Sequence, residues 1–464
     1  MSAIRLNNVG FAYKDNNLIL KDVNVTLDYN NLVLIAGHSG EGKSTILGIL
    51  TGIIPNIING NLTGEVYIND VNINDKKINE ICRSVGVVIQ DADMQIIQKY
   101  VGDEIAFGCE NLAFKRDIIQ RQIDITTKLL DLDKNAICHS LSGGEKQRLS
   151  VASTLAMGQR IIILDEPLAN IDYKAAHNLM NILAELKKSG YLVIVIEHRL
   201  DIVLPYADKV FNLENKALNE ILDYNSFLIK QSTKISDSCK IASHNDKILS
   251  LNNISYKIKN KEILSNINLD IYKGERLLIL GENGCGKTTL LRIISKIIKP
   301  SNGSINNYNP NKKKKWYDQV GVIFQNPNYE LFMPTVEKEI KFKAFSLEYA
   351  DEIAELFDIK RFYHRHPGSL SLGERRLVSI AAILARKPEI LILDEPTVGE
   401  DYNKLCKMIN VLNEIHQKTN NTMITITHDI RCASAICDRA IWIKNKEIYK
   451  IGNKELVDDF FSNL

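Results

Sequence analysis

Two glycine-rich stretches have the residue types and the spacing that binding of a phosphate group requires. Gly37–Thr45 reads GHSGEGKST and Gly281–Thr289 reads GENGCGKTT, and each stretch follows an apolar run and precedes a helical pattern. In this context the pattern GxxxxGK[ST] predicts a loop whose backbone N–H groups point at phosphate oxygens, at the positive end of the following helix. Lys43 and Lys287 would supply charge to the phosphates, and a chance lysine in a glycine-rich turn explains two such copies poorly.

Two acidic pairs, Asp165-Glu166 and Asp394-Glu395, each end an apolar run that reads as a strand. The carboxyl ends of strands are where open α/β sheets bind ligands. The first carboxylate of each pair suits Mg²⁺, which prefers hard oxygen ligands, and the second is placed to polarise an attacking water. Taken alone, each pair could be an exposed acidic turn. Beside two phosphate loops, the catalytic interpretation is favoured.

Four further polar side chains follow strand-like runs at matching places. Gln90 follows VGVVI and Gln325 follows VGVIF, and an amide there can reach a metal ion or the attacking water. His198 follows LVIVIE, and His428 follows MITIT. A single histidine after a strand is more often structural than catalytic. The catalytic interpretation of these two is favoured only because both halves have a histidine at the matching position.

These features recur in the same order at nearly one offset, so the chain contains an internal repeat. The repeat predicts one domain at residues 1–228 and a second at residues 247–464, and the polar stretch 229–246 reads as a linker. Runs such as Leu32–Gly37 and Leu192–Ile196 are short, branched and apolar on both faces, which is typical of buried parallel strands that alternate with helices. The sequence therefore predicts an α/β fold.

Composition disfavours several other classes of protein. Apolar residues make up 45% and charged residues 25% of the chain, and no apolar run approaches the length of about 18 that spans a bilayer. The N-terminus, MSAIRLNNVGFAY, has no apolar signal core, which favours the cytoplasm. The eight cysteines form no CxxC pair, which argues against a zinc site or a disulfide framework. The net charge of +2 gives no reason to expect long-range attraction to nucleic acid.

Together these landmarks resemble ATP-binding-cassette (ABC) ATPases, and the resemblance covers nearly the whole chain, twice. It implies an α/β fold of two P-loop NTPase domains, each with a mostly parallel sheet core, an antiparallel β subdomain and a helical subdomain. It also implies ATP and Mg²⁺ as cofactors and ATP hydrolysis as the activity. LSGGE, with Ser142, Gly143 and Gly144, is then the signature of the first half, and LSLGE, with Ser371 and Gly373, is that of the second.

The resemblance assigns three sets of residues at matching positions. The catalytic set comprises the glutamates that activate water and the switch histidines: Glu166, His198, Glu395 and His428. The Mg²⁺ ligands are Ser44, Gln90, Asp165, Thr288, Gln325 and Asp394. The nucleotide-binding set comprises both phosphate loops, the Q-loop glutamines, the signature residues and a tyrosine for the adenine in each half: Tyr13, Gly37, Ser39, Gly40, Gly42, Lys43, Ser44, Thr45, Gln90, Ser142, Gly143, Gly144, Tyr256, Gly281, Asn283, Gly284, Gly286, Lys287, Thr288, Thr289, Gln325, Ser371 and Gly373. The two tyrosines match less specifically, because a tyrosine early in a β-rich segment is often simply packed.

In ABC ATPases the two domains face each other head to tail, and each ATP lies between the phosphate loop of one domain and the signature of the other. The resemblance therefore implies that Ser371 and Gly373 complete the site of Lys43. In the same way, Ser142 and Gly144 would complete the site of Lys287. Because both halves belong to one chain, this nucleotide sandwich is expected within a monomer.

Two residues distinguish the halves. Leu372 replaces a glycine of the signature, and its side chain would either point away from the nucleotide or crowd it. Cys285 lies close to Lys287 and to a helix N-terminus, both of which lower the pKa of a thiol, so a reactive thiolate is one hypothesis, while a small, tolerated filler residue is the favoured interpretation. The basic run Lys312–Lys315 reads as a solvated loop.

The segments after the Q-loop glutamines resemble energy-coupling-factor (ECF) ATPases, whose pattern is close to QNPxxQ[IL]F…TVxxxxAFGxEN. Gln90–Leu112 and Gln325–Phe342 match it, apart from Ala92 in place of proline and Glu330 in place of glutamine, and Gly52–Val66 resembles fused two-domain members. The resemblance implies an ATP hydrolase that drives uptake of a vitamin-like molecule or a metal ion, peripheral at the cytoplasmic face of the cell membrane. Its partners would be a transmembrane coupling subunit and a substrate-binding membrane subunit, and no residue of this chain encodes the cargo.

A tandem ABC ATPase that acts on ribosomes or nucleic acid is the alternative. Such translation factors usually have a longer, charged helical linker, and DNA-repair relatives have zinc cysteines or coiled-coil insertions. The near-neutral net charge also argues against a surface that binds nucleic-acid phosphates, so no nucleic-acid partner is expected. Fused sugar-uptake ATPases are a further alternative.

The LSLGE signature predicts unequal ATP sites, with slower turnover at the site that contains Lys43. If Leu372 crowds the nucleotide there, Glu166→Gln should reduce the rate of ATP hydrolysis less than Glu395→Gln does. Steady-state rates of the two variants test this prediction. Equal losses, or a larger loss from Glu166→Gln, would contradict it.

Overall fold

The structure is a computed structural model that describes residues 2–14, 17–38, 40–169, 171–224, 227, 246–259, 261–308, 315–397 and 402–462. The chain divides into two compact units, Met1–Thr233 and Lys234–Leu464. The domain limits at residues 228 and 247 stay predictions, because most of the segment between them lies outside the described residues. The same holds for three of the four lysines at 312–315.

The first unit is built on a six-stranded sheet in the order β10-β9-β3-β8-β7-β6, and every neighbouring pair is parallel except the β9–β10 hairpin. The central strands are buried on both faces, as runs of branched apolar residues require. In chain order the strands are β3 (Leu32–Gly37), β6 (Val85–Val88), β7 (Ile161–Asp165), β8 (Leu192–Ile196), β9 (Lys209–Glu214) and β10 (Ala217–Glu220).

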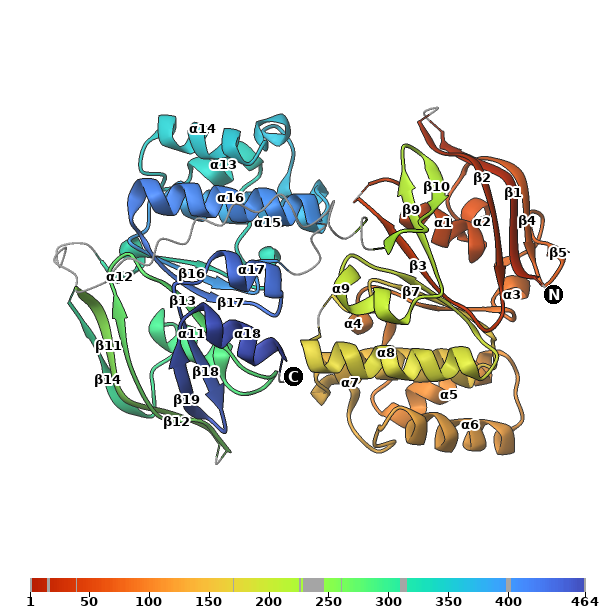
Figure 1. Ribbon diagram of the computed structural model, residues 1–464, viewed down its shortest axis with the longest axis horizontal. Helices are drawn as coiled ribbons and strands as arrows, with labels where there is room; N and C mark the ends of the chain where they lie inside the picture. The colour runs from red at the N-terminus through yellow and green to blue at the C-terminus, as the bar shows by residue number, and fades with distance from the viewer. Residues whose placement is uncertain are drawn as a thin grey trace. The chain divides into compact units, whose positions relative to one another are not determined.

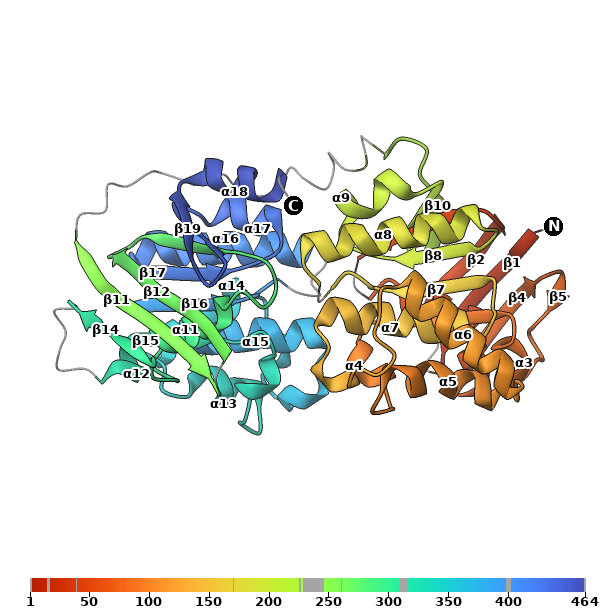
Figure 2. The same ribbon diagram turned by 90° about the horizontal axis from the view of Figure 1, so that it is seen from below.

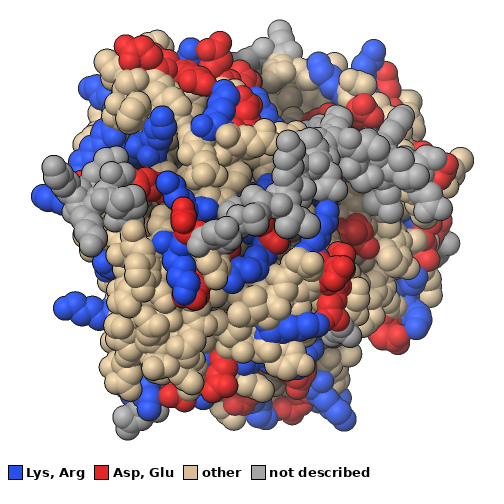
Figure 3. Space-filling model, turned by 60° about the vertical axis from the view of Figure 1, so that its left-hand side comes forward, with Lys and Arg blue, Asp and Glu red and all other residues tan. Residues whose placement is uncertain are grey.

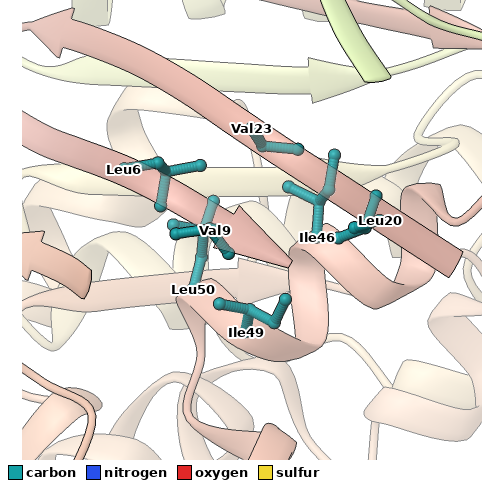
Figure 4. Close-up of a pocket in the computed structure, with 7 residues that line it drawn as sticks. All are labelled: Leu6, Val9, Leu20, Val23, Ile46, Ile49 and Leu50. Carbon is teal, nitrogen blue, oxygen red and sulfur yellow. The ribbon is translucent and has the colours of Figure 1, made fainter. Parts of the chain in front are cut away.

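A smaller antiparallel sheet in the order β2-β1-β4-β5 packs against α1 (Lys43–Leu50). Its strands are β1 (Ser2–Tyr13), β2 (Leu18–Asp28), β4 (Gly60–Ile68) and β5 (Val71–Asn72). Apolar side chains of β1, β2 and α1 point toward one another around a small cavity in Figure 4: Leu6, Val9, Leu20, Val23, Ile46, Ile49 and Leu50. The same core includes Ile35 and Ile163 of the large sheet, so α1 lies between the two sheets. Burial contributes on the order of 2 kcal/mol for each such side chain, which fixes the helix that begins at Lys43.

Helices cover the opposite face of the large sheet, as Figures 1 and 2 show. They are α5 (Val101–Asn111), α6 (Arg116–Leu129), α7 (Gly143–Ala156), α8 (Tyr173–Lys188) and α9 (Leu200–Val203). Shorter helices lie in the connections: α2 (Ile53–Asn56), α3 (Ile78–Ile81), α4 (Ala92–Gln95) and the 3₁₀ helices η1 (Cys138–Ser140) and η2 (Leu204–Tyr206). Leucine, isoleucine and valine side chains of the large sheet and these helices form one core cluster.

The second unit has the same plan. Its large sheet has the order β15-β16-β17-β13-β18-β19, and its antiparallel sheet has the order β12-β11-β14. The strands are β11 (Lys247–Ile258), β12 (Lys261–Tyr272), β13 (Arg276–Leu280), β14 (Asn302–Asn307), β15 (Val320–Ile323), β16 (Ile390–Asp394), β17 (Thr422–Ile426), β18 (Arg439–Lys444) and β19 (Glu447–Gly452). The core between the two sheets contains α11 (Lys287–Ile294), in the place that α1 has in the first unit.

The remaining helices of the second unit lie mainly on the other face of its large sheet. They are α12 (Trp316–Gln319), η3 (Pro327–Tyr329), α13 (Val336–Lys341), α14 (Leu347–Leu356), η4 (Lys360–Phe362), η5 (Pro367–Ser369), α15 (Leu372–Leu384), α16 (Tyr402–Thr419), α17 (Ile430–Ala435) and α18 (Lys454–Ser462). Within the described residues, no helix combines the length and the hydropathy needed to cross a bilayer.

The order of the strands positions the functional residues. β3, β8 and β7 are parallel neighbours, with Ile35 beside Ile196 and Ile196 beside Asp165. Their carboxyl ends therefore meet at one edge, which brings together the phosphate loop after β3, the acidic pair at the end of β7 and the histidine after β8. The strands β13, β17 and β16 repeat this arrangement. The predicted α/β fold of two P-loop domains is confirmed.

Candidate functional site

Each phosphate loop leaves a central strand and turns back into a helix. In the first unit β3 ends at Gly37 and α1 begins at Lys43, whose residue surface is 7% exposed. The Nζ of Lys43 donates hydrogen bonds of 2.8 and 3.0 Å to the carbonyl oxygens of Gly37 and His38. Lys287 makes the same contacts, at 2.8 Å with the carbonyl oxygen of Gly281 and 3.0 Å with that of the next residue. Both ammonium groups are thus held at the loop by backbone oxygens.

Glycine is required directly before each helix. Gly42 has a φ of 106° and Gly286 has a φ of 103°, in the region that side-chain-bearing residues rarely adopt. A Cβ atom would also lie 2.6 Å from Ile19 at Gly42 and 2.7 Å from Leu264 at Gly286. Only glycine therefore permits this turn without strain in its own backbone and displacement of these side chains of the antiparallel sheet.

The loops have the features that bind a triphosphate. Each has a lysine ammonium and the N-terminus of an eight-residue helix, which together attract and orient an anion. Nothing lies within 4 Å of a Cβ built on Gly40 or Gly284, so both loops border open space. Ser39, predicted to contact the nucleotide, lies outside the described residues.

The first carboxylate of each pair lies in a setting that disfavours its charge. Burial, with the charge of Glu166, raises the pKa of Asp165 to about 6, and burial raises the pKa of Asp394. The Thr288 hydroxyl donates to Asp394 at 3.3 Å, whereas Ser44, at the matching position, is exposed. Carboxylate and hydroxyl oxygens are the hard donors that Mg²⁺ prefers, and a nearby cation would stabilise both charged carboxylates. These residues therefore fit a Mg²⁺ ion bound together with the nucleotide.

The second carboxylate of each pair is held by a strained backbone. Glu166 has a φ of 45° and Glu395 has a φ of 51°, values that are uncommon for residues other than glycine and that cluster at functional sites. The N–H of Glu166 donates to the carbonyl oxygen of Ile196 at 2.8 Å, and that of Glu395 donates to Ile426 at 3.0 Å. The neighbouring strand thus maintains this conformation in both units.

Each predicted catalytic glutamate lies next to its predicted histidine. The Nε2 atom of His198 is 3.1 Å from Oε1 of Glu166, and that of His428 is 3.3 Å from Oε1 of Glu395. His428 also contacts Oδ1 of Asn283 in the phosphate loop, at 2.9 Å. The structure therefore brings the four predicted catalytic residues together in two pairs, one at each phosphate loop.

The two Q-loop glutamines are placed differently. The Gln90 amide donates to Oε2 of Glu166, whereas the Gln325 side chain is exposed. In the second unit Arg376 donates to the carbonyl oxygen of Gln325 at 2.7 Å and to that of Glu395 at 2.6 Å. A guanidinium from the signature helix thus joins the Q-loop to the acidic pair by their backbones.

The predicted tyrosines and signature residues differ in their surroundings: the tyrosines lie beside the cores, and the signature residues lie at helix N-termini. Tyr13 is 37% exposed, and its hydroxyl is 3.4 Å from that of Thr45, while Tyr256 is half-buried against the core. Ser142 and Ser371 cap α7 and α15, each in a reciprocal contact with the glutamate three residues later. Gly143 and Gly144 begin α7, and Gly373 lies in the first turn of α15. Leu372 is 41% exposed at the start of its helix, so both alternatives for its side chain stay open.

The lowering of the Cys285 pKa that the sequence predicts is wrong in direction. Burial raises the pKa of the Cys285 thiol and outweighs the nearby charge of Lys287. Its Sγ atom would lie 2.5 Å from a Cβ built on Gly281, so the sulfur occupies the space inside the loop. The favoured interpretation, a small filler residue, fits this packing better. The sequence reveals the nearby lysine and helix, but it does not reveal the burial of Cys285 that determines the direction of its pKa shift.

Both halves of the chain match one known protein family. A family model described as ABC transporter matches residues 20–169 and matches again at residues 264–398, which together are more than half of the chain. The chain belongs to the ABC transporter family. Its two ABC ATPase domains bind ATP, typically with Mg²⁺, and this architecture indicates ATP hydrolysis.

Relatives of similar length match nearly the whole chain. A Methanosarcina mazei protein, provisionally named an ABC transporter ATP-binding protein, is 30% identical over 99% of this chain and 97% of its own length. A Treponema denticola protein with the same provisional name is 29% identical over 96% of each chain. A solved structure described as "Model of ribosome-bound archaeal Pelota and ABCE1" matches 98% of this chain and 80% of its own, with a TM-score of 0.77 and 19% identity. That likeness shows the ABC fold alone.

The ABC site also contains residues that the sequence analysis missed. Arg376 lies in the signature LSLGERR without a distinguishing spacing, and its contacts depend on the fold. Glu330 appeared as a departure from the ECF pattern but not as a buried group. It accepts hydrogen bonds from the Phe324 N–H and the Ser379 hydroxyl, whereas its counterpart Gln95 accepts from the Ile89 N–H at 3.0 Å.

Glu330 predicts a pH-dependent stability of the second unit. Burial raises its pKa from 4.5 to about 7, so the folded chain retains a proton that the unfolded chain loses between these pH values. Stability is therefore lost as the pH rises through this interval, by about 1.4 kcal/mol for each pH unit. Glu330→Gln should remove this cost, stabilising the second unit by about 3 kcal/mol at pH 8 and by less than about 1 kcal/mol at pH 5.

Denaturant unfolding at both pH values, followed by tryptophan fluorescence, measures this difference, because both tryptophans, Trp316 and Trp442, belong to the second unit. The matched change Gln95→Glu places the same carboxylate in the first unit and should lower stability more at pH 8 than at pH 5, as calorimetry can follow. A Glu330→Gln effect of equal size at pH 5 and pH 8 would contradict the assignment.

Proposed function

We propose that this chain is the ATP-hydrolysing motor subunit of an ABC importer, of energy-coupling-factor type, that drives uptake of a vitamin-like small molecule or a metal ion through separate membrane subunits. The observation that carries the proposal is a matched pair of exposed apolar side chains after each Q-loop glutamine. Met94 is 79% and Ile97 is 68% exposed in the first unit, and Tyr329 is 78% and Phe332 is 63% exposed in the second. In each unit the pair is called the Q-loop apolar surface of that unit.

The backbone beneath the Q-loop apolar surface is fixed in both units by a buried carboxylate. Glu104, 5% exposed, accepts the N–H groups of Ile97 and Gln98 at 2.9 and 2.7 Å. Glu339, 1% exposed, accepts those of Phe332 and Met333 at 2.8 and 2.7 Å. Apolar side chains held out on an ordered backbone are typical of a protein interaction site, because ordering them in advance reduces the entropy lost on binding.

Polar contacts connect this surface to the machinery of each domain. Asp93, beside Met94, pairs with Lys146 of α7 at 2.5 Å, and Asn328, beside Tyr329, accepts from Arg375 of α15 at 2.5 Å. Both α7 and α15 have a signature serine as their N-cap. In the first unit the Q-loop also contacts Glu166 through the Gln90 amide. A partner helix docked on the Q-loop apolar surface would therefore respond to changes at the nucleotide, which is what a motor subunit requires.

For the chemistry we assign roles to the chain's own side chains. Lys43 and Lys287 bind the phosphates, and Mg²⁺ held by Asp165 with Ser44, and by Asp394 with Thr288, would neutralise developing negative charge when bound. Glu166 and Glu395 accept a proton from the attacking water, and His198 and His428 orient these carboxylates from about 3 Å away. The strained backbone at each glutamate holds its carboxylate in place for this step.

We further propose that the signature of each repeat completes the ATP site of the other, as a nucleotide sandwich within one chain. Closure around two nucleotides would then pull the Q-loop apolar surfaces of the two units, with the docked partner helices, toward each other. Product release would reopen the sandwich. The chain would work at the cytoplasmic face of the membrane, with a transmembrane coupling subunit and a substrate-binding subunit as partners.

The provisional names of the full-length relatives, as ABC transporter ATP-binding proteins, support a transport role. The alternative, action on ribosomes, is favoured by the ribosome-bound state of the similar archaeal structure, but at 19% identity that likeness extends to the fold alone. Charge favours transport as well, because the net charge is +2 and, on the face in Figure 3, acidic and basic side chains are interspersed. A nucleic-acid surface would need basic groups concentrated together.

Charged substitutions in the Q-loop apolar surface test the proposal. Met94→Glu with Ile97→Glu, or Tyr329→Glu with Phe332→Glu, should prevent co-purification with a multi-span membrane protein from solubilised membranes, because a buried carboxylate cannot replace apolar contact. Circular dichroism should show unchanged folding. The control Val71→Glu changes an exposed apolar residue of β5, 51% exposed, and should retain the partner. Recovery of the parent chain with ribosomes instead of membrane protein would contradict the proposal.

A further inference from the structure

The residues on either side of His198 have a charge pattern that the second unit lacks at the matching positions. His198 lies between Glu197 and Arg199, whereas His428 lies between Thr427 and Asp429. Glu197 is 2% exposed and directly follows β8. A carboxylate buried this deeply needs several hydrogen-bond donors to be tolerated.

Glu197 obtains these donors from two segments of the chain. Its Oε1 atom accepts the N–H of Leu168 at 2.9 Å, from the segment that follows Glu166. Its Oε2 atom accepts the N–H groups of His198 and Arg199, the latter at 3.0 Å. Burial raises the pKa of Glu197, while the N–H groups of Arg199 and His198 oppose the shift. One carboxylate therefore joins the backbone of the histidine to the backbone that follows the catalytic glutamate.

Arg199 holds the same segment from the other side. Its Nη1 atom donates hydrogen bonds of 3.1 Å to the carbonyl oxygens of Leu168 and Ile171. The N–H of Leu168 is thus bound by Glu197 and its C=O by Arg199. A residue with both backbone groups fixed by charged side chains cannot shift without moving those side chains and, with them, His198.

The second unit has other chemistry at these places. The hydroxyl of Thr427 is 3.1 Å from that of Thr397, which has the position of Leu168 in the repeat. The Asp429 carboxylate pairs with Arg431 and caps α17. Thr427 thus has a hydroxyl where Glu197 has a carboxylate, and Asp429 has a carboxylate where Arg199 has a guanidinium. A carboxylate only accepts hydrogen bonds, so Asp429 cannot donate to a carbonyl oxygen as Arg199 does.

We propose that Glu197 and Arg199 are positioning residues that clamp the backbone at Leu168 to His198, and so hold Glu166 in its catalytic geometry in the first unit. The inference rests on the roles proposed above for Glu166 and His198. The carboxylate of Glu166 and the imidazole of His198 approach to 3.1 Å. The clamp fixes the backbone at Leu168, which follows Glu166, and the backbone N–H of His198. Neither positioning residue takes part in proton transfer.

Isosteric and conservative variants of the full chain test the clamp. The glutamine side chain of Glu197→Gln has one acceptor oxygen, which cannot serve both segments, so this variant should have a lower kcat of ATP hydrolysis. We expect its loss in kcat to be most of the loss that Glu166→Gln causes. The KM for ATP should change little, because no phosphate contact is altered. Misplacing a catalytic group costs up to about 100-fold in rate, and we expect about tenfold at this site. Arg199→Lys retains the charge and should fall between the parent and Arg199→Met.

Hydrogen–deuterium exchange gives a readout independent of catalysis. Glu197→Gln and Arg199→Met should increase exchange in the peptide that contains Leu168 and leave the matched peptide around Thr397 unchanged, and the control Thr427→Val should leave the Leu168 peptide unchanged. Unaltered kcat and unaltered exchange in Glu197→Gln, with a clear loss in Glu166→Gln, would overturn the clamp and spare the catalytic assignment. No loss in Glu166→Gln would overturn both. A raised KM with unchanged kcat would also overturn the clamp.

Discussion

The contact between a lysine ammonium and the carbonyl oxygens of its own glycine loop is the interaction on which the rest of the site depends. Lys43 and Lys287 make it with the same pair of distances. It requires a strand that ends at the loop, a glycine with positive φ before the helix, and a helix fixed between two sheets. The parallel order of the strands then brings the acidic pair and the histidine to the same edge.

Around this loop the protein concentrates groups that are costly to bury. Asp165 and Asp394 have raised pKa values, Glu166 and Glu395 have strained backbones, and burial raises the pKa of Glu197 although N–H donors oppose the shift. The scaffold can maintain them because its central strands are apolar on both faces and the helices cover them. A cation bound among the carboxylates would relieve their repulsion, and the lysine ammonium groups attract the triphosphate, so the site is electrostatically prepared for a cation and a triphosphate together. Stability is given up at the residues that perform the chemistry.

Sequence alone predicted the parts of this structure that local patterns specify. The repeat, the buried strands and the placement of the acidic pairs at strand ends follow from apolar runs and glycine spacing, whereas the contact between Glu166 and His198 emerged from the structure. Glu330, Arg376 and Glu197 could not be assigned, because each gains its role from partners on other elements. A carboxylate directly after the apolar run LVIVI was the available signal for Glu197. The pKa of Cys285 was predicted in the wrong direction because burial, which dominates it, is a tertiary property.

The central claim is that ATP is held by the two lysine-bearing loops, and the double variant Lys43→Ala, Lys287→Ala tests it most directly. Hydrolysis of ATP by the purified full chain should fall at least about 100-fold, the scale on which removal of a charge-stabilising donor acts. Circular dichroism should show that the variant is folded. A folded double variant that consumes ATP at the parent's rate would contradict the account.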